Sequence, residues 1–226
     1  MKLKRLLAPE FWKVPKKVLK FTVSPRPGPH KKFECIPLMI IVRDVLKLAE
    51  TGSEAKKIIK KGEILVDGKK RKDHAYPVGL MDAVSVPRIK KYFRVIPGEK
   101  GLELVEIEES EANKKICRIN SKKVLKKGKI QLNLHDGRNI LVEKDDYKTG
   151  DSLLIEVPSQ KILQHIKLKV GSLGIILKGK NSGKKARVEE IIERKSLRES
   201  KKVLCDVEGK KVEINKDYFF VLEGSE

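Results

Sequence analysis

The most informative part of the sequence runs Ala55-Lys-Lys-Ile-Ile-Lys-Lys-Gly-Glu-Ile-Leu-Val-Asp-Gly68 and is followed by Tyr76-Pro-Val-Gly-Leu-Met-Asp-Ala-Val-Ser-Val86. Ile58 and Ile59 are spaced from Ala55 as on one face of a helix, and Gly62 follows as a helix-ending residue. Lysines fill the other helical positions. The pattern therefore predicts an amphipathic helix with a basic outer face, which Thr51 or Ser53 can cap.

A first helix is predicted upstream, because apolar residues recur at helical spacing at Ile40, Ile41, Val45, Leu48 and Ala49. After the second helix, residues 64 and 66 alternate with polar neighbours up to Asp67-Gly68, which predicts a strand and a tight turn. Another strand is predicted within 76–86. Residues 37–92 should thus form two short helices packed on a few strands.

Composition restricts the class of protein. The chain has 226 residues, 52 Lys+Arg against 31 Asp+Glu, a net charge of +21, and only 5% aromatic residues. No apolar run is long enough to span a membrane, and the first residues lack the pattern of a secretory signal. Three cysteines favour a reducing, cytoplasmic compartment over a disulfide scaffold. A chain this basic is expected to bind a polyanion, and nucleic acid is the obvious one.

The charge is unevenly distributed. Residues 1–32 contain 10 basic and 1 acidic residue, a net charge of +9, whereas 33–92, 93–160 and 161–226 carry +5, +1 and +6. The 41 lysines outnumber the 11 arginines, which favours diffuse phosphate contacts over reading of base edges. Basic segments at both ends therefore flank a nearly neutral middle.

Residues 1–36 are predicted to be an extended basic tail, because five prolines interrupt them. Such a tail should become ordered only on a partner. Trp12 could either dock on the next domain or stack on unpaired bases. The candidate RNA-binding residues of the tail are Lys4, Arg5, Trp12, Arg26, His30, Lys31 and Lys32.

The 37–92 stretch resembles the small helix–helix–strand RNA-binding domain first described in bacterial small-subunit ribosomal protein four. Two departures from that family are visible: its Ser-Arg pair at the start of the second helix is Thr51-Gly52 here, and its Gly-Asp pair is Met81-Asp82. The resemblance implies contacts with structured RNA through basic residues on the helix pair and the following turn, which here are Arg43, Lys56, Lys57, Lys60, Lys61, Lys69, Lys70, Arg71 and Lys72.

Residues 93–160 are predicted to be a central β-rich domain. Ile130, Leu132 and Leu134 alternate before a turn at 135–139, and another alternating strand ends before Pro158. Their near-neutral charge favours a spacer or a protein-contact module. The acidic segment 106–111 should face solvent or a basic neighbour, since RNA would repel it.

Residues 161–226 contain Val170-Gly-Ser-Leu-Gly-Ile-Ile-Leu-Lys-Gly-Lys-Asn-Ser-Gly183. This resembles the KOW motif of ribosomal proteins and elongation factors, which implies a small β-barrel whose loop presents backbone N–H groups and lysines to phosphate. Ala186 stands where that motif has glycine. The candidate contacts are Lys178, Gly179, Lys180, Asn181, Gly183, Lys184, Lys185 and Arg187.

Enzymatic chemistry is not supported by the sequence. Gly174 to Lys180 superficially matches an NTPase phosphate loop, but Asn181 stands where a magnesium-binding hydroxyl is needed. The cysteines and histidines do not have metal-ligand spacing, and no catalytic constellation is found. We therefore expect no catalytic residue, no metal site, no cofactor and no small-molecule substrate.

Taken together, the chain is predicted to be a multi-domain α+β protein with parts 1–36, 37–92, 93–160 and 161–226. The order of these parts, with Leu3-Lys-Arg-Leu-Leu-Ala-Pro-Glu-Phe-Trp12 and Pro25-Arg-Pro-Gly-Pro-His-Lys-Lys-Phe-Glu-Cys-Ile-Pro37, resembles the archaeal and eukaryotic type of small-subunit ribosomal protein four. The resemblance implies a structural, ribosome-bound component that binds ribosomal RNA and neighbouring ribosomal proteins, without membrane association or obligate self-association. The compact length favours an archaeal source.

Two other classes of protein share parts of this sequence pattern. An RNA-modifying enzyme such as a pseudouridine synthase can carry the same small RNA-binding domain, but no remaining segment is long enough for its catalytic domain. A transcription or translation factor can carry the KOW barrel and would cycle on and off its target.

Overall fold

A computed structural model describes the chain except for residues 1, 16–17, 19, 126–127, 193–199 and 225–226. Its contacts divide the chain into two compact units. Unit 1 contains Met1–Ile96, Lys100–Lys115 and Val157–Ser159, and unit 2 contains Pro97–Glu99, Ile116–Glu156 and Gln160–Glu226. The four-part division of the sequence stays a prediction. The expected mixed fold is confirmed at a coarser level, because strands dominate and helices are few.

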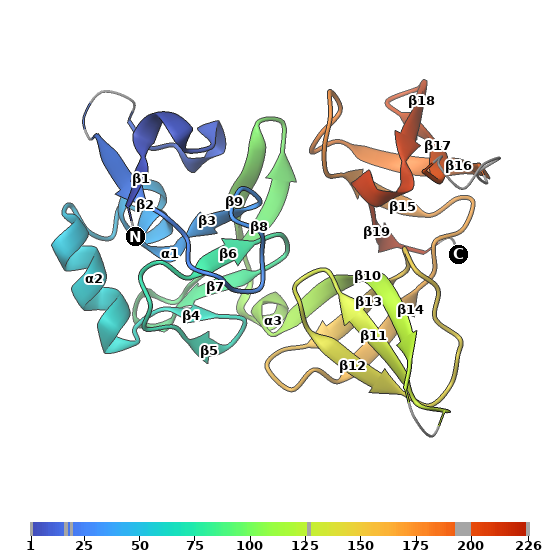
Figure 1. The fold of residues 1–226 in the computed structure, drawn as a ribbon, viewed down its shortest axis with the longest axis horizontal. Helices are drawn as coiled ribbons and strands as arrows, with labels where there is room; N and C mark the ends of the chain where they lie inside the picture. The colour runs from blue at the N-terminus through green and yellow to red at the C-terminus, as the bar shows by residue number, and fades with distance from the viewer. Residues whose placement is uncertain (1, 16–17, 19, 126–127, 193–199, 225–226) are drawn as a thin grey trace. The chain divides into compact units, whose positions relative to one another are not determined.

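The main sheet of unit 1 has the strand order β5-β4-β7-β8-β9 (Figure 1). Its strands are β4 Leu65–Val66, β5 Lys69–Lys70, β7 Ala83–Val86, β8 Lys91–Gly98 and β9 Gly101–Ile107. Two smaller antiparallel pairs join β1 Lys2–Lys4 to β2 Phe21–Val23, and β3 Cys35–Pro37 to β6 Pro77–Gly79. Asp67 and Gly68 adopt positive φ angles of 50° and 71°, which close the predicted tight turn between β4 and β5.

The predicted helix pair is confirmed, except that the first helix ends at Val45 and leaves Leu48 and Ala49 outside it. The first helix consists of α1 Leu38–Ile40 and a π-helical turn η3 Ile41–Val45, and the second is α2 Gly52–Lys61. Thr51 and Glu54 form a reciprocal capping box at the start of α2, and Gly62 ends it in the left-handed conformation. The remaining short helices of unit 1 are η1 Arg5–Leu7, η2 Glu10–Trp12, η4 Pro87–Ile89 and α3 Glu109–Ala112.

The described residues of the N-terminal segment belong to unit 1, so the prediction of a tail that is ordered only on a partner is wrong. Docking of Trp12 on the neighbouring domain, one of its two predicted roles, is confirmed. Trp12 is 0% exposed, belongs to the apolar core, and donates its indole N–H to the carbonyl of Cys35 at 2.8 Å. Arg5 is also buried, and its guanidinium donates to the carbonyl of Val14 at 3.0 Å through Nε. Burial of the tryptophan ring offsets the repulsion within this basic segment.

Unit 1 contains a buried ionic network. Lys115 is 0% exposed and donates to the carboxylates of Asp67, at 2.8 Å, and Asp82. The second oxygen of Asp82 lies 3.0 Å from Nε2 of His30 and accepts the backbone N–H of Gly79 at 2.9 Å. Burial raises the pKa of Asp82, but Lys115 and His30 outweigh burial and hold this pKa well below its usual range. The network therefore links His30 of the N-terminal segment to Asp82, which precedes β7, and to Asp67 in the β4–β5 turn.

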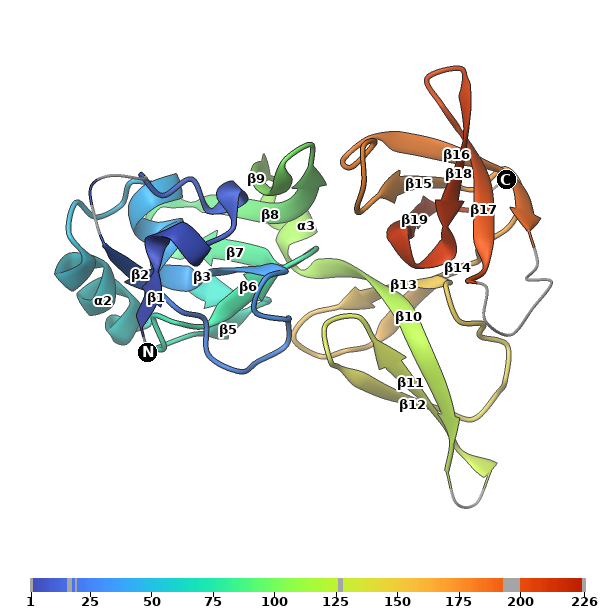
Figure 2. The same cartoon turned by 45° about the horizontal axis from the view of Figure 1, so that its top comes forward.

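Unit 2 contains two five-stranded sheets, whose strands Figure 2 labels. The first has the order β12-β11-β10-β13-β14, with β10 Lys114–Val124, β11 Ile130–Leu134, β12 Asn139–Val142, β13 Ser152–Glu156 and β14 Ile162–Ile166. The second has the order β18-β17-β16-β15-β19, with β15 Leu173–Ile176, β16 Lys185–Ile192, β17 Lys202–Val207, β18 Lys210–Asn215 and β19 Phe219–Glu223, which η6 Lys216–Tyr218 precedes. Strands predicted at 130–134, 153–157, 203–207 and 211–214 are confirmed.

The three cysteines are buried thiols. Cys35 lies in unit 1, and Cys117 and Cys205 lie in unit 2. Burial, with smaller contributions from Asp82 and Glu34, raises the pKa of Cys35 to about 12, and burial with Glu189 raises that of Cys205 to about 11.

Among the described residues, no helix has the length and apolarity needed to cross a membrane.

Candidate nucleic-acid interface

The basic face of α2 is the best-formed part of the candidate interface. Ala55 and Ile59 are buried against the core, while Lys56, Lys57, Lys60 and Lys61 are all exposed. In the described chain, none of these four lysines takes part in an ion pair. The amphipathic pattern has therefore placed four exposed positive charges on one helix, of which Lys57 lies close enough to Glu54 to add to the backbone hydrogen bonds that lower the pKa of that carboxyl.

The β4–β5 hairpin extends this basic face. Lys69, Lys70 and Lys72 are exposed, and a Cβ built on Gly62 would lie 3.6 Å from Cδ of Lys70 and 3.9 Å from Cε of Lys72. The two lysine stems thus pass over the end of α2. We call this surface the α2 patch, and it consists of Lys56, Lys57, Lys60, Lys61, Lys69, Lys70 and Lys72.

Two arginines predicted for the same surface have protein partners instead. Arg71 stacks its guanidinium over the Tyr76 ring, 4.4 Å from the centroid, and is only partly exposed. Arg43 makes a two-point bond with the Asp44 carboxylate, at 3.0 and 2.8 Å. Nη1 of Arg43 also lies 3.5 Å from where a Cβ of Gly52 would be. Arg43 of the first helix thus lies beside the start of α2, where the family has an arginine and this chain has Gly52.

The second departure from the family's sequence is Met81-Asp82, and the structure shows how this pair keeps the turn. Met81 adopts a φ of +61°, the left-handed region that favours glycine, and its side chain is 3% exposed. Asp82 keeps its place and holds the buried network. Packing of the methionine side chain offsets the backbone strain, so the turn retains its shape without a glycine.

The N-terminal segment provides fewer candidate contacts than the sequence suggested. Lys4, Arg26, Lys31 and Lys32 are exposed, and Arg26 pairs with Asp73 at 3.3 Å. Arg5, Trp12 and His30 face the interior, where each has a protein partner. These three residues stabilise unit 1, and we leave them out of the interface because no RNA can reach their side chains.

The loop at 178–185 presents a second group of cations. Lys178, Lys180, Lys185 and Arg187 are exposed, and Gly179 has a φ of +97° with open space around it. Asn181 is partly buried, and Lys184 pairs with Glu208 at 2.6 Å. Lys178 lies 5.7 Å from the centre of the Tyr218 ring.

The base of this loop is anchored by Ser182, which was not among the residues predicted from the sequence, and by the predicted contact Gly183. The Ser182 hydroxyl donates to the carbonyls of Gly98 and Leu177, at 3.0 and 3.1 Å. Gly183 lies so close to Gly98 that a Cβ would be 2.7 Å from its carbonyl carbon. Gly183 is therefore needed for close backbone packing rather than for contact with a ligand.

The acidic segment lies where the sequence analysis expected it. Glu106, Glu108, Glu109 and Glu111 are exposed, and Glu106 pairs with Lys91 at 3.7 Å. These carboxylates lie on β9, on α3 and at the N-cap of α3, none of which carries a candidate basic contact.

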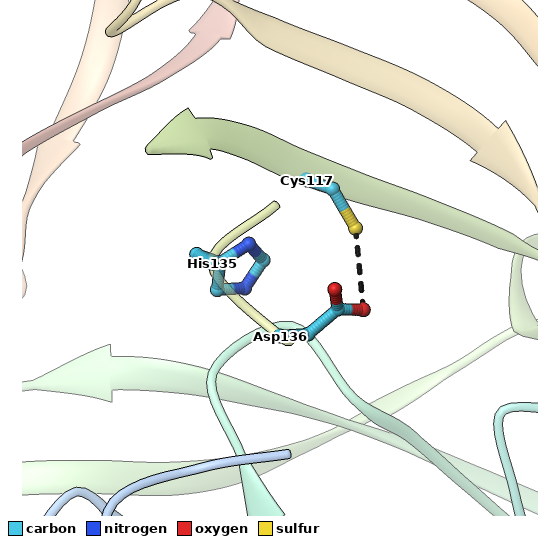
Figure 3. Close-up of side chains that lie close together, drawn as sticks. All are labelled: Cys117, His135 and Asp136. Carbon is cyan, nitrogen blue, oxygen red and sulfur yellow. Dashed lines mark hydrogen bonds between the residues drawn. The ribbon is translucent and has the colours of Figure 1, made fainter. Parts of the chain in front are cut away.

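One cluster with metal-ligand chemistry occurs in the described part of the chain, and it consists of Cys117, His135 and Asp136 (Figure 3). The Cys117 thiol donates to Asp136 at 3.6 Å, and Nδ1 of His135 accepts the backbone N–H of Arg118 at 3.2 Å. Asp136 also bonds Arg138 through its backbone N–H, at 3.2 Å, and its Nε, at 3.3 Å. Because protein donors already use these atoms, the cluster does not suit a cation. It stabilises the turn between β11 and β12.

Comparisons with known proteins identify the architecture. Residues 36–84 match the S4 domain, so the chain is an S4-domain protein. Residues 1–33 match the RS4NT (NUC023) domain, and residues 89–162 match the Ribosomal family S4e. The small ribosomal subunit proteins eS4 of Methanocaldococcus jannaschii and Archaeoglobus fulgidus are 47% and 45% identical, over 99% and 97% of this chain and 94% and 92% of theirs. The crystal structure of the 30S ribosomal protein S4e from Thermoplasma acidophilum matches with a TM-score of 0.74 and 27% identity, over 85% of this chain and 96% of that one.

The chain belongs to the S4e family of small ribosomal subunit proteins. The resemblance drawn from the sequence is confirmed, as is the expectation of a structural, non-enzymatic protein of translation with archaeal relatives. Its S4 domain implies RNA binding, and its family implies a place on the ribosome.

Proposed function

We propose that this chain binds small-subunit ribosomal RNA chiefly through the α2 patch, as a structural protein of the cytoplasmic ribosome. The supporting observation is that seven exposed lysines gather on α2 and the adjoining hairpin, and that among the described residues those of α2 form no salt bridge. Such lysines are well suited to bind RNA phosphates, because neutralising a phosphate releases the counterions condensed on the RNA backbone, and this release favours binding.

Two further contacts are proposed. The first is the exposed part of the N-terminal segment, with Lys4, Lys31 and Lys32. The second is the 178–185 loop, with Lys178, Lys180, Lys185 and Arg187, which we still interpret as a KOW-type loop on a small β-barrel. The near-neutral middle, including the acidic segment, would face neighbouring ribosomal proteins or solvent.

The salt dependence of binding tests the α2 patch. Replacing Lys56 and Lys60 by alanine should reduce the slope of log affinity against log salt by about 1.5, because each lost phosphate contact contributes about 0.7 to 0.9. The measurement is a filter-binding titration of the full chain on small-subunit ribosomal RNA at several salt concentrations.

The matched control is the double variant Lys91→Ala with Lys211→Ala. It removes the same charge, but these lysines pair with Glu106 and Glu189 at 3.7 and 2.8 Å. Its slope should remain that of the wild type. Equal slopes for both double variants would show that binding responds to net charge and not to the α2 patch.

A further inference from the structure

Tyr218 is an exposed aromatic residue of unit 2. Of the four tyrosines in the chain it alone is exposed, with an exposed fraction of 40%, whereas the other three are partly buried. The two residues that follow it, Phe219 and Phe220, are 1% and 0% exposed. Unit 2 therefore buries two neighbouring aromatic rings and leaves the third, that of Tyr218, in contact with solvent.

The backbone at Tyr218 is held by several hydrogen bonds. Tyr218 is the last residue of η6, at whose start the Asn215 side chain accepts the backbone N–H of Asp217 at 3.1 Å. The carbonyl of Tyr218 accepts the backbone N–H of Leu177 at 2.7 Å, and the Arg118 guanidinium donates to the carbonyl of Asp217. The exposed ring thus projects from a well-anchored support, which lowers the entropy that a ligand must remove.

Tyr218 lies at the start of the basic 178–185 loop. Its backbone bond to Leu177 places it beside the residue that precedes this loop. Nζ of Lys178 lies over the Tyr218 ring, 5.7 Å from its centre, a distance at which the cation and the face of the ring attract one another. The ring and the first lysine of the loop therefore form one continuous surface.

The segments on either side of this ring carry a net positive charge. Residues 176–188 contain five basic residues and no acidic one. Glu208 neutralises Lys184, with which it pairs at 2.6 Å, and Lys216 offsets the adjacent Asp217. The remaining positive charge favours an anionic ligand, and the exposed ring favours a ligand that also has a flat face.

An unpaired nucleotide of RNA has both features. Its base offers a flat π face to an aromatic ring, and its phosphates are attracted to lysines. Such stacking tolerates any base, because every base has a π face. An acidic peptide would satisfy the lysines but not the ring, and a base within a double helix is already stacked on its neighbours.

We propose that Tyr218 stacks on one unpaired base of bound RNA, while lysines of the 178–185 loop contact the phosphates beside that base. The inference rests on the proposed RNA-binding function and adds a base contact, without sequence selectivity, to this loop. Stacking was one of two predicted roles of Trp12, whose ring is buried. The structure offers Tyr218 for that role instead.

Affinity and its salt dependence test the stacking contact. In filter-binding titrations of the full chain on small-subunit ribosomal RNA, Tyr218→Leu should weaken binding about tenfold at every salt concentration. The slope of log affinity against log salt should stay unchanged, because no phosphate contact is lost. Tyr218→Phe should bind as the wild type does, because it keeps the aromatic face. The matched control Val105→Ala, which alters an exposed residue of β9 in the acidic segment, should leave affinity and slope unchanged.

Fluorescence gives a second, direct measurement. Tyr218→Trp places an indole at the site, and small-subunit ribosomal RNA should quench its emission, because a stacked base quenches indole. Trp12 is 0% exposed and provides a constant background. The matched control is Val105→Trp, at a position with a similar exposed fraction of 44%. RNA should leave the emission of this control unchanged.

The outcomes separate this inference from the proposed function. Wild-type affinity of Tyr218→Leu, binding by Tyr218→Phe as weak as that of Tyr218→Leu, or unquenched emission of Tyr218→Trp would overturn the stacking contact and leave RNA binding intact. A smaller salt slope in Tyr218→Leu would overturn it as well, because a phosphate contact would then explain the loss. Failure of the wild type to bind small-subunit ribosomal RNA would overturn both. Circular dichroism checks the fold of Tyr218→Leu, and Tyr218→Trp decides the question if that variant does not fold.

Discussion

Lys115 carries its positive charge into the interior of unit 1, where its side chain is 0% exposed. The carboxylates of Asp67 and Asp82 compensate it, and His30 bonds to Asp82. The bonded pairs are 33 to 52 residues apart in the sequence. Nothing in the periodicity around Lys115 distinguishes it from the many surface lysines. For that reason the network could not be predicted from the sequence, whereas the cap of α2 could.

Replacing Lys115 by alanine should lower the free energy of unfolding of unit 1 by about 3 to 5 kcal/mol, because it leaves two buried carboxylates without their cation. Urea denaturation followed by circular dichroism measures the loss. Lys114→Ala is the matched control: Lys114 is the exposed neighbour, and its replacement should change stability by no more than about 0.5 kcal/mol. Similar losses for both variants would contradict the role of the network.

The low pKa of Asp82 gives unit 1 an acid-sensitive stability. In the unfolded chain this carboxyl titrates near pH 3.9, and in the folded chain at lower pH, so the unfolded state takes up the proton first as the pH falls. The stability contributed by Asp82 is present above about pH 4 and is lost below it. The difference in unfolding free energy between wild type and Asp82→Asn should therefore narrow from pH 6 to pH 3. A constant difference would show that Asp82 keeps an ordinary pKa.

At the scale of elements, the helix pair and the hairpins follow from local rules. Apolar spacing, a capping box and turn glycines each specify their element within a few residues, so these were predictable from the sequence. The order of the N-terminal segment was predictable only in part: docking of Trp12 was one of two alternatives, but its bond to Cys35, 23 residues away, follows from no local pattern. Charge and proline content alone indicated a tail that would fold only with a partner.

The capping box of α2 should set the stability of the basic face. Thr51→Ala removes the hydroxyl that accepts the Glu54 N–H at 3.2 Å, and it should cost about 1 kcal/mol of unfolding free energy. Ser53→Ala changes an exposed neighbour that is not the cap, and it should have little effect. Hydrogen exchange of the first α2 amides reports the difference directly. Unchanged exchange in Thr51→Ala would mean that packing alone holds the helix.

At the scale of the whole molecule, each unit has its own apolar core. The core of unit 1 surrounds Trp12 and Ile59, and one in unit 2 surrounds Val203 and Phe219. The sequence indicated the grouping of basic segments around a neutral middle, but not the passage of 100–115 and 157–159 into unit 1. That passage depends on contacts such as Lys115 with Asp67, which no local pattern encodes.

Two cores predict two unfolding transitions in calorimetry. Ile59→Ala should lower the midpoint of one transition by several degrees, because it removes buried apolar volume from unit 1, while the other stays in place. Val203→Ala should do the converse. A single transition that both substitutions shift equally would mean that the units unfold together.

The buried thiols have a practical consequence. With the pKa of Cys35 and Cys205 raised to about 12 and about 11, almost no thiolate exists near neutral pH, and reagents such as maleimides cannot reach the sulfur atoms of the native chain. Thiol reagents should therefore leave the native protein unlabelled. A cysteine introduced at an exposed site such as Lys180 can carry a fluorophore without a background signal, and slow alkylation of Cys35 or Cys205 marks the opening of the unit that contains it.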